Sequence, residues 1–152
     1  MSTTRQYCTF FVNGLFLGLD VLRIQEVIKF QEMTQVPLAP SVVSGLINLR
    51  GQIVTAMDLR RRLGFKDRPA GVLAMNVVVR TDEGVVSLLV DDIGEVVEVA
   101  DDSFEVPPET LVGEARQIVR GVYKLKDRLL LIIDADETVQ IPSSPALVHA
   151  AA

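Results

Sequence analysis

The sequence predicts a mostly β fold made of two small barrel-like lobes and a few short helices. The main observation is a repeat, in which four residues recur 76 positions later in the 152-residue chain: Val43, Gly45, Leu49 and Asp58 return as Val119, Gly121, Leu125 and Asp134. Both copies also hold short runs of β-branched and apolar residues separated by turn residues, which are typical of strands. Four or five short strands per copy suit a small barrel, because a barrel pairs its own strand edges.

The repeat extends upstream at an offset of 69 residues, where six further positions align: Leu19, Val21, Ile24, Glu26, Val27 and Ile28 correspond to Leu88, Val90, Ile93, Glu95, Val96 and Val97. Self-similarity on this scale indicates one unit used twice. We therefore expect a single domain over residues 1–152, with one lobe at about 15–70 and another at about 71–140. The N-terminal strand is free to exchange between the lobes, and residues 142–152 are expected to form a tail.

The first copy begins with a predicted hairpin of residues 7–12 and 15–20. Asn13-Gly14 between them is a strong hairpin signal, because both positions tolerate positive φ. Residues 21–30 are expected to continue as a bent or bulged strand, since their β-branched content disfavours a helix. A second hairpin is predicted from residues 46–50 and 53–57. Asp58 would then cap a short helix that ends near Gly64.

The second copy is predicted to repeat this order of elements. Strands are expected at residues 73–80, 85–90 and 93–99, and a hairpin from residues 118–125 and 128–133. Asp134 then precedes a short helix over residues 135–139, as Asp58 does in the first copy.

The composition argues against several kinds of chemistry. Cys8 and His149 are the only cysteine and histidine, so neither a zinc site nor a histidine-based triad is expected. The glycine motifs that bind phosphate are absent, and a net charge of −5 disfavours nucleic acid. We expect no metal, no cofactor and no enzymatic activity.

The sequence also favours a cytoplasmic location. No apolar run approaches the ~18 residues that cross a bilayer, so no direct membrane insertion is expected. The start of the chain lacks the apolar stretch of a signal peptide. A single cysteine excludes an internal disulfide and fits a reducing compartment.

Asp58 and Asp134 are the one carboxylate pair that could act together. Each follows a predicted buried strand and precedes a helix-like turn, so two matched helix caps are the first interpretation. The alternative is a small β-barrel enzyme in which the two carboxylates share a proton. That alternative requires both side chains to reach one pocket.

Charged residues are unevenly distributed along the chain. Residues 50–68 hold six basic and two acidic residues, whereas residues 91–109 hold eight acidic and no basic residues. Solvated surface is the usual explanation of such runs. The functional interpretation is a pair of complementary patches that orient a partner protein or join copies head to tail.

Three segments together resemble the CheW family over roughly residues 7–138. They are Gly18 to Val27, the Val36-Pro37 segment leading to Gly45, and the stretch around Asn48-Leu49-Arg50-Gly51 that runs on to Arg60. The resemblance implies two SH3-like five-stranded β-barrels that share a hydrophobic core. It also implies a cytoplasmic scaffold, associated with membrane-bound receptor arrays, that couples chemoreceptors to the histidine kinase CheA.

The resemblance further suggests which residues contact partners. In such scaffolds one surface meets the regulatory domain of CheA, and the groove between the barrels meets the cytoplasmic hairpin tip of the receptor. The positions that match the family's receptor-binding residues are Ile24, Glu26 and Gly45, and the motif arginine, with a structural or signalling role, is Arg50. The candidates for kinase contact are Ile53, Thr55, Leu59 and Arg62.

Two features depart from the family pattern. Leu17 stands where the family often has an aromatic residue, and a Pro/Ser/Ala tail follows residue 139 where the family commonly has a longer apolar helix. These departures leave a second interpretation open, a related coupling protein in a non-chemotactic array such as one that controls gliding or pili.

Overall fold

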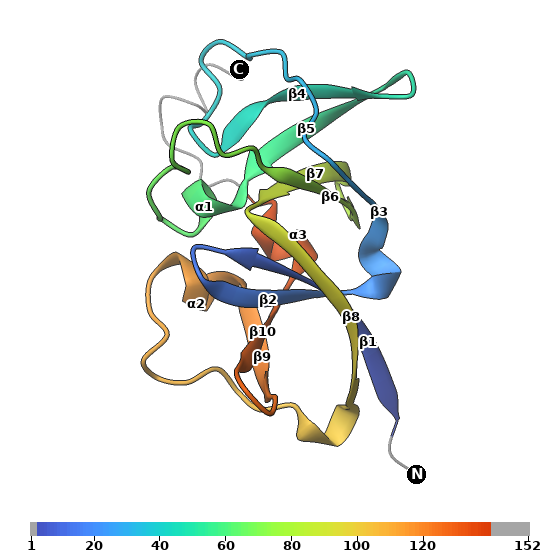
Figure 1. The fold of residues 1–152 in the computed structure, drawn as a ribbon, viewed down its shortest axis with the longest axis vertical. Helices are drawn as coiled ribbons and strands as arrows, with labels where there is room; N and C mark the ends of the chain where they lie inside the picture. The colour runs from blue at the N-terminus through green and yellow to red at the C-terminus, as the bar shows by residue number, and fades with distance from the viewer. Residues whose placement is uncertain (1–2, 141–152) are drawn as a thin grey trace.

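Two five-stranded sheets make up most of the chain, and short helices cap or connect their strands (Figure 1). The structure is a computed structural model that describes residues 3–140, so the expected tail at 142–152 lies outside the described residues. The expected fold class is confirmed: the chain is mostly β, with two five-stranded units and few helices. In chain order the elements are β1 (Thr4–Val12), β2 (Leu15–Asp20), the 3₁₀ turn η1 (Val21–Arg23), β3 (Ile24–Ile28), β4 (Val43–Leu49), β5 (Gln52–Asp58), α1 (Leu59–Arg62), β6 (Met75–Thr81), β7 (Gly84–Val90), β8 (Asp92–Ala100), the 3₁₀ turn η2 (Asp101–Ser103), α2 (Glu114–Ile118), β9 (Val119–Lys124), β10 (Leu129–Ile133) and α3 (Ala135–Thr138).

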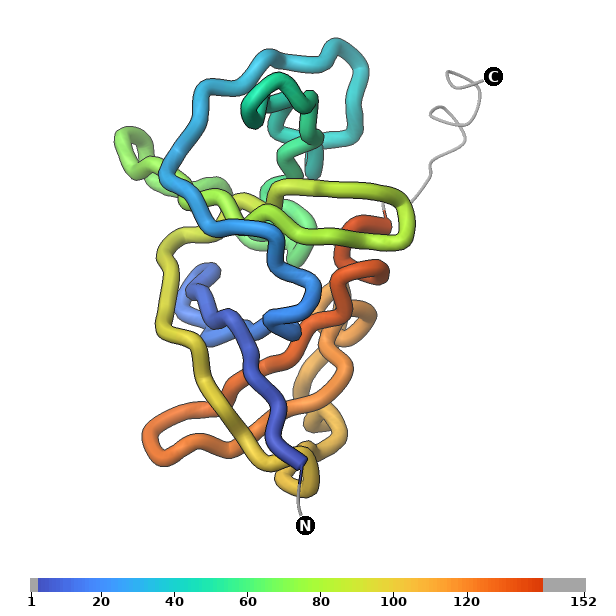
Figure 2. Tube along the Cα trace, turned by 90° about the vertical axis from the view of Figure 1, so that its right-hand side faces the viewer, coloured from blue at the N-terminus to red at the C-terminus, as the bar shows by residue number. Residues whose placement is uncertain are grey.

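Each sheet combines a hairpin from one half of the chain with three strands from the other half. Lobe 1 has the strand order β3-β6-β7-β5-β4, and lobe 2 has the order β8-β1-β2-β10-β9. Figure 2 shows β1 in dark blue beside β8 in yellow. The sheets therefore do not follow the expected ranges of 15–70 and 71–140. Lobe 1 is built from residues 24–90, and lobe 2 from residues 4–20 and 92–133, because the N-terminal hairpin pairs with strands of the second copy.

Strand register shows that the two lobes are equivalent. Thr55 of β5 lies beside Val86 of the parallel strand β7, and Leu131 of β10 lies beside Leu17 of the parallel strand β2. These pairs differ by the same offsets, 76 and 69, that align the two sequence copies. The repeat in the sequence is therefore a repeat in the pairing of strands.

The chain passes from lobe 2 to lobe 1 directly after β2. Asp20 ends that strand and accepts the Leu22 N–H at 2.9 Å, which caps the turn η1. The predicted strand over residues 21–30 is thus interrupted at its start by one 3₁₀ turn. The expected bulge is present, between Ile24 and Glu26.

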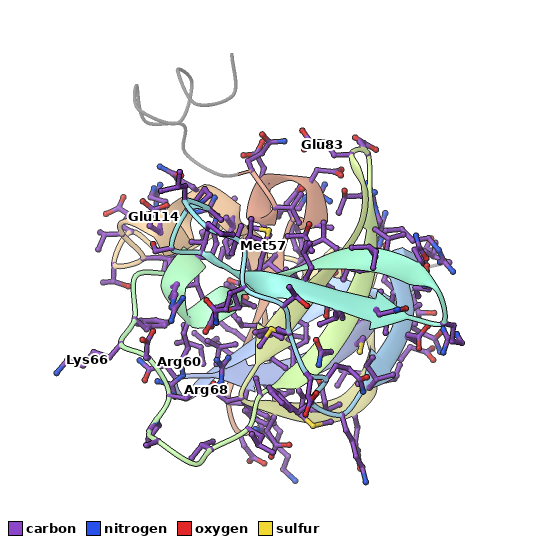
Figure 3. All side chains as sticks on the ribbon, turned by 90° about the horizontal axis from the view of Figure 1, so that it is seen from above. Met57, Arg60, Lys66, Arg68, Glu83 and Glu114 are labelled. Atoms are coloured by element: carbon purple, nitrogen blue, oxygen red, sulfur yellow. The ribbon has the colours of Figure 1, made fainter. Side chains whose placement is uncertain are left out.

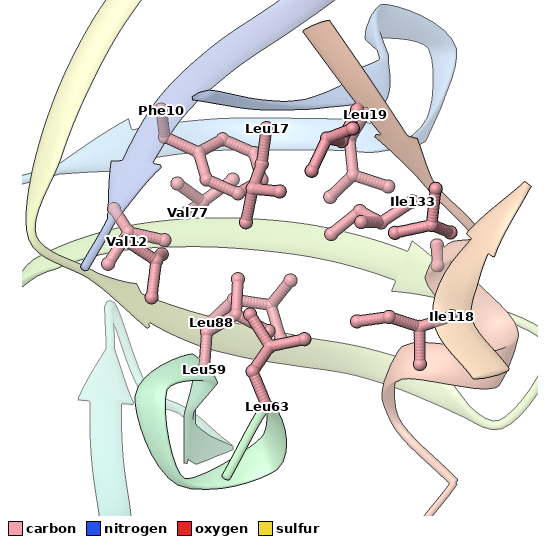
Figure 4. Packing of buried hydrophobic residues seen from close by; sticks show 14 of the residues in the cluster. Phe10, Val12, Leu17, Leu19, Leu59, Leu63, Val77, Leu88, Ile118 and Ile133 are labelled. Atoms are coloured by element: carbon pink, nitrogen blue, oxygen red, sulfur yellow. The ribbon is translucent and has the colours of Figure 1, made fainter. Parts of the chain in front are cut away.

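The largest core lies between the two sheets, so most strands are buried on both faces. Leu17 of lobe 2 and Leu88 of lobe 1 both belong to this shared core (Figure 4). Neighbouring residues on the same strands face smaller cores, with Leu89 inside lobe 1 and Phe16 and Leu130 inside lobe 2. Strands covered on both faces need continuous apolar runs rather than alternation, which explains the run of five apolar residues in β10.

The glycine that recurs in both copies permits a close crossing of the chain. Thr34 forms an isolated bridge with Leu46, and a Cβ on Gly45 would lie 2.7 Å from the Thr34 carbonyl oxygen. Gly121 is crossed in the same way, because a Cβ there would lie 2.6 Å from the Glu105 carbonyl oxygen. The repeated Val-x-Gly pattern thus marks where the preceding segment closes over each sheet edge.

The two repeated aspartates cap short helices, as predicted. Asp58 Oδ1 accepts the Arg60 N–H at 2.9 Å at the start of α1. Asp134 Oδ1 accepts the Glu137 N–H at 3.0 Å at the start of α3. Neither these helices nor any other within residues 3–140 is long and apolar enough to cross a membrane.

Candidate functional site

Glu26 and Arg50 form an ion pair that connects the two edges of the lobe 1 sheet. The surface around this ion pair is the lobe 1 seam. Glu26 lies on β3 and Arg50 lies in the turn between β4 and β5; β3 and β4 are the opposite edges of the sheet, so the pair forms only because the sheet curls. The Asn48 side chain holds this turn by accepting the Gly51 N–H at 2.8 Å. The hydrogen bond from Arg50 lowers the pKa of Glu26, so the carboxylate stays charged.

The four predicted receptor-binding residues have different environments. Ile24 lies on the same strand as Glu26 and packs partly against the shared core. Arg50 keeps most of its side chain in solvent, with 72% exposed. Gly45 is buried beneath residues 33 and 34, so it shapes the fold and offers no surface. Glu26, Arg50 and Ile24 therefore remain as candidates for direct contact.

The predicted kinase-binding residues divide into exposed and buried ones. Ile53 is 61% exposed and Thr55 is half-buried, both on β5. Leu59 is 1% exposed and belongs to the shared core, and Arg62 is 4% exposed. The expectation that Leu59 and Arg62 present a surface to a kinase is wrong, because α1 turns both side chains into the protein.

Arg62 instead joins α1 to the helices of lobe 2. Its guanidinium donates to the carbonyl oxygens of Thr138 and Glu137 at 3.0 and 3.1 Å. It also donates to the Glu114 carboxylate at 2.6 Å. These carbonyls end the short helix α3, so a cation there complements the helix dipole.

A second buried cluster centres on Asp91, which lies between β7 and β8. Arg60 donates to both of its carboxylate oxygens, and Arg68 Nε pairs with Oδ1 at 2.8 Å. The backbone N–H of Asn13 donates to Oδ2 at 2.7 Å. Arg60 and Arg68 lie next to each other in Figure 3, and Arg68 also donates to Asp58 Oδ2 at 2.9 Å.

Sequence reasoning missed this cluster, because it assigned the basic segment 50–68 to the surface. Arg60 and Arg68 are engaged by Asp91, Arg61 pairs with Asp67 at 2.9 Å, and Arg62 is buried. The segment therefore contributes little free positive charge to a surface patch. Two features of the sequence could have indicated the cluster. Asp91 directly follows a buried strand, and the arginines of segment 50–68 have few acidic neighbours in sequence.

Asp58 and Asp134 do not share a pocket. Asp58 lines a cavity of about 310 Å³ on lobe 1, and Asp134 lines a separate cavity of about 330 Å³ on lobe 2. Each carboxylate caps its own helix. Among residues 3–140, no cluster of His, Cys, Asp and Glu side chains could hold a metal ion. The geometry gives no support to the two-carboxylate enzyme.

The fold, with the Glu26–Arg50 ion pair at its lobe 1 seam, is a two-lobed β domain of the CheW-like class. The family model described as CheW-like domain matches residues 6–142, and the chain belongs to the CheW family. It is 28% identical to the chemotaxis protein CheW of Bacillus subtilis, over 97% of this chain and 95% of that protein. It is 24% identical to CheW of Treponema pallidum, over 85% of this chain and 78% of that one. The crystal structure of the scaffolding protein TtCheW from Thermoanaerobacter tengcongensis superposes with a TM-score of 0.83 at 27% identity, covering 92% of this chain and 95% of that chain.

Proposed function

We propose that this chain is a non-enzymatic adaptor that couples chemoreceptors to the histidine kinase CheA. The match to CheW proteins along almost the full length of both chains carries this proposal. The adaptor binds the cytoplasmic hairpin tip of a receptor and the regulatory domain of CheA. It works in the cytoplasm, at membrane-bound receptor arrays.

The receptor tip contacts the lobe 1 seam at Ile24, Glu26 and Arg50. What supports this choice is that residues from two separated segments meet there as a charged pair with an exposed arginine. Rim charges of this kind orient a partner and raise its rate of association more than they raise affinity. Ile24, on the other side of the β3 bulge, packs partly against the shared core and supplies the apolar surface that helix docking requires.

The kinase domain contacts β5 near Ile53. A large apolar side chain that is 61% exposed on a regular strand is a suitable anchor for an interface centre. Thr55 lies two residues further along the same strand and therefore on the same face. Leu59 and Arg62 affect this contact only through the fold, because they are buried.

A bridging assay tests the proposal. A receptor hairpin tip is immobilised, and the regulatory domain of CheA is added with and without this chain. Retention of the regulatory domain only in the presence of the chain is the expected result. If the chain retains neither partner on its own and forms no ternary complex with both, the adaptor function is wrong.

A further inference from the structure

The two cavities occupy equivalent places in the two lobes. Five positions that line the lobe 1 cavity correspond, by strand register and repeat offset, to five that line the lobe 2 cavity: Met33, Ser44, Asp58, Ala74 and Leu89 match Phe104, Arg120, Asp134, Arg5 and Asp20. Three of these exchanges replace a small or apolar residue by a charged one. At these three positions the lobe 2 cavity has charged side chains where the lobe 1 cavity has neutral ones.

In lobe 1 a guanidinium group of the chain itself forms part of the wall of this cavity and pairs with its aspartate. Arg68 donates to Asp58 Oδ2 at 2.9 Å and to the Leu89 carbonyl oxygen at 3.1 Å. Its side chain is 8% exposed, as is that of Asp58. The capping aspartate thus uses one oxygen for its helix and the other for a buried cation.

In lobe 2 the corresponding carboxylate oxygen has no close donor among the described residues. Asp134 Oδ2 faces only Arg120 Nε, at 3.7 Å, and the Arg120 side chain is 65% exposed. Asp20 Oδ2, on the other wall, faces only Arg5 Nη1, at 3.9 Å. Both separations exceed the length of a hydrogen bond, whereas Asp58 in lobe 1 is held at 2.9 Å.

Two of the three arginines that line the lobe 2 cavity are held by other carboxylates, and the third, Arg120, faces Asp134. Arg5 directs its Nε to Asp101 at 2.8 Å, and Arg23 directs its Nη2 to Asp136 at 2.9 Å. The Oδ2 atoms of Asp20 and Asp134 are thus held less closely than Arg5 Nε and Arg23 Nη2 are. To reach Arg5 or Arg23, an anion would have to displace ion pairs of hydrogen-bond length, whereas a cation would compete only with the longer contacts that Arg120 and Arg5 make to Asp134 and Asp20.

We infer that the lobe 2 cavity binds a guanidinium or primary ammonium group supplied from outside residues 3–140 of this chain. Seated as Arg68 is in lobe 1, such a group would donate to Asp134 Oδ2 and lie beside Asp20. A protein side chain and a free organic cation share this chemistry. The site goes beyond the receptor and kinase contacts proposed above and does not depend on them.

The two tyrosines of the chain give this site its own optical signal. Tyr7 and Tyr123 both line the cavity, they are the only tyrosines, and the chain has no tryptophan. Their hydroxyls lie 3.4 Å apart and both rings are buried. Intrinsic tyrosine emission therefore reports on this cavity and on the lobe 2 core beside it.

Titration with agmatine, which carries a guanidinium and an ammonium group, tests the inference in the full chain. Tyrosine emission should change saturably, with a dissociation constant on the order of 1 mM or tighter. Asp134→Asn should weaken binding at least tenfold while still capping α3, because asparagine is also a favoured N-cap. Glu109→Gln, at an exposed carboxylate without an ion pair among the described residues, is the matched control and should leave binding unchanged.

A second variant separates loss of binding from loss of folding. Arg120→Ala removes the one cation that faces Asp134 Oδ2, so agmatine should bind several-fold more tightly. Unfolding could not produce that gain. N-acetyl-Gly-Arg-Gly amide, tested alongside, assigns the site to a protein side chain if it binds as well as agmatine, and to a free cation if only agmatine binds. The inference is overturned if neither probe gives a saturable change, if Asp134→Asn binds as the wild type does, or if acetate produces the response instead.

Discussion

Arg60 donates Nε and Nη2 to the two carboxylate oxygens of Asp91, over 2.8 and 2.7 Å. The pair is 14% and 19% exposed, and Asn13 and Arg68 donate to or pair with the same carboxylate. Asn13 belongs to the turn between β1 and β2, so one carboxylate joins lobe 2 to the end of lobe 1. Bidentate geometry of this kind gives both strength and a fixed orientation.

Asp91→Asn should destabilise the chain by about 3 kcal/mol, because it leaves the largely buried Arg60 without its charge partner and removes one of the two carboxylates that Arg68 contacts. Urea unfolding followed by circular dichroism measures this loss. Asp67→Asn removes the partner of the more exposed Arg61 and serves as the control, with a far smaller effect expected. Equal losses in the two variants would show that burial does not govern the strength of these pairs.

Stability should fall in acid through the same residue. Burial alone would raise the pKa of Asp91, but the hydrogen bonds from Arg60 and Asn13 and the charges of Arg68 and Arg60 outweigh it, and the net pKa is lowered. The folded chain therefore releases this proton more readily than the unfolded chain. The contribution of Asp91 is present above about pH 4 and is lost as the pH falls through the lowered pKa. Unfolding free energies measured between about pH 6 and pH 3 should decline less steeply in Asp91→Asn than in the wild type.

Gly45→Ala should destabilise the chain by about 2 kcal/mol, because the new Cβ would press against backbone. The contact is with the Thr34 carbonyl oxygen at 2.7 Å, which a side-chain rotation cannot relieve. Thermal unfolding measures the effect, and Ser44→Ala on the same strand is the control. A Gly45→Ala variant as stable as the wild type would mean that residues 33–34 do not close over this glycine.

Glu26→Lys should weaken binding to a receptor tip by about tenfold, because it places two cations at the lobe 1 seam. Glu95→Lys is the matched control, since Glu95 occupies the equivalent position of β8 and makes no ion pair among the described residues. Surface plasmon resonance with an immobilised tip compares the two variants. If both variants bound the receptor tip equally weakly, the cause would be the change in net charge and not the loss of the Glu26–Arg50 ion pair.

Ile53→Glu should weaken binding to the regulatory domain of CheA without lowering the unfolding temperature. The side chain is 61% exposed, so its replacement removes contact area and leaves the cores intact. Leu59→Ala should show the opposite pattern, with a loss of about 3 kcal/mol in stability and unchanged affinity for the fraction that is folded. Titration calorimetry with the regulatory domain of CheA measures the affinity of each variant, and scanning calorimetry measures its stability.

Local features of the fold could be predicted from the sequence, and the pairing of distant strands could not. Asn13-Gly14 indicated its hairpin, and Asp58 and Asp134 indicated their helix starts, because turn and cap chemistry is local. The entry of β1 and β2 into the sheet of the second copy depends on contacts between residues 81 to 114 positions apart. Apolar alternation is equally compatible with either sheet.

The candidate site was predictable only in part, for a related reason. Glu26 and Arg50 could be named from family motifs, but their ion pair requires the curl of the sheet. Leu59 and Arg62 follow a strand end closely, and nothing in the residue types shows which way α1 turns them. Arg60 and Arg68 looked like surface charge, because their partner Asp91 is 31 and 23 positions away in sequence.

The exchanged hairpins have a consequence for how the chain is made. A ribosome releases β1 and β2 first, yet their sheet partners β8, β9 and β10 emerge only with residues 92–133. The sheet of residues 24–90 can form in the meantime, while the first hairpin has two unpaired edges and an uncovered apolar face. Such edges are open to pairing with other chains. The N-terminal hairpin therefore completes its sheet only after almost the entire chain has been made.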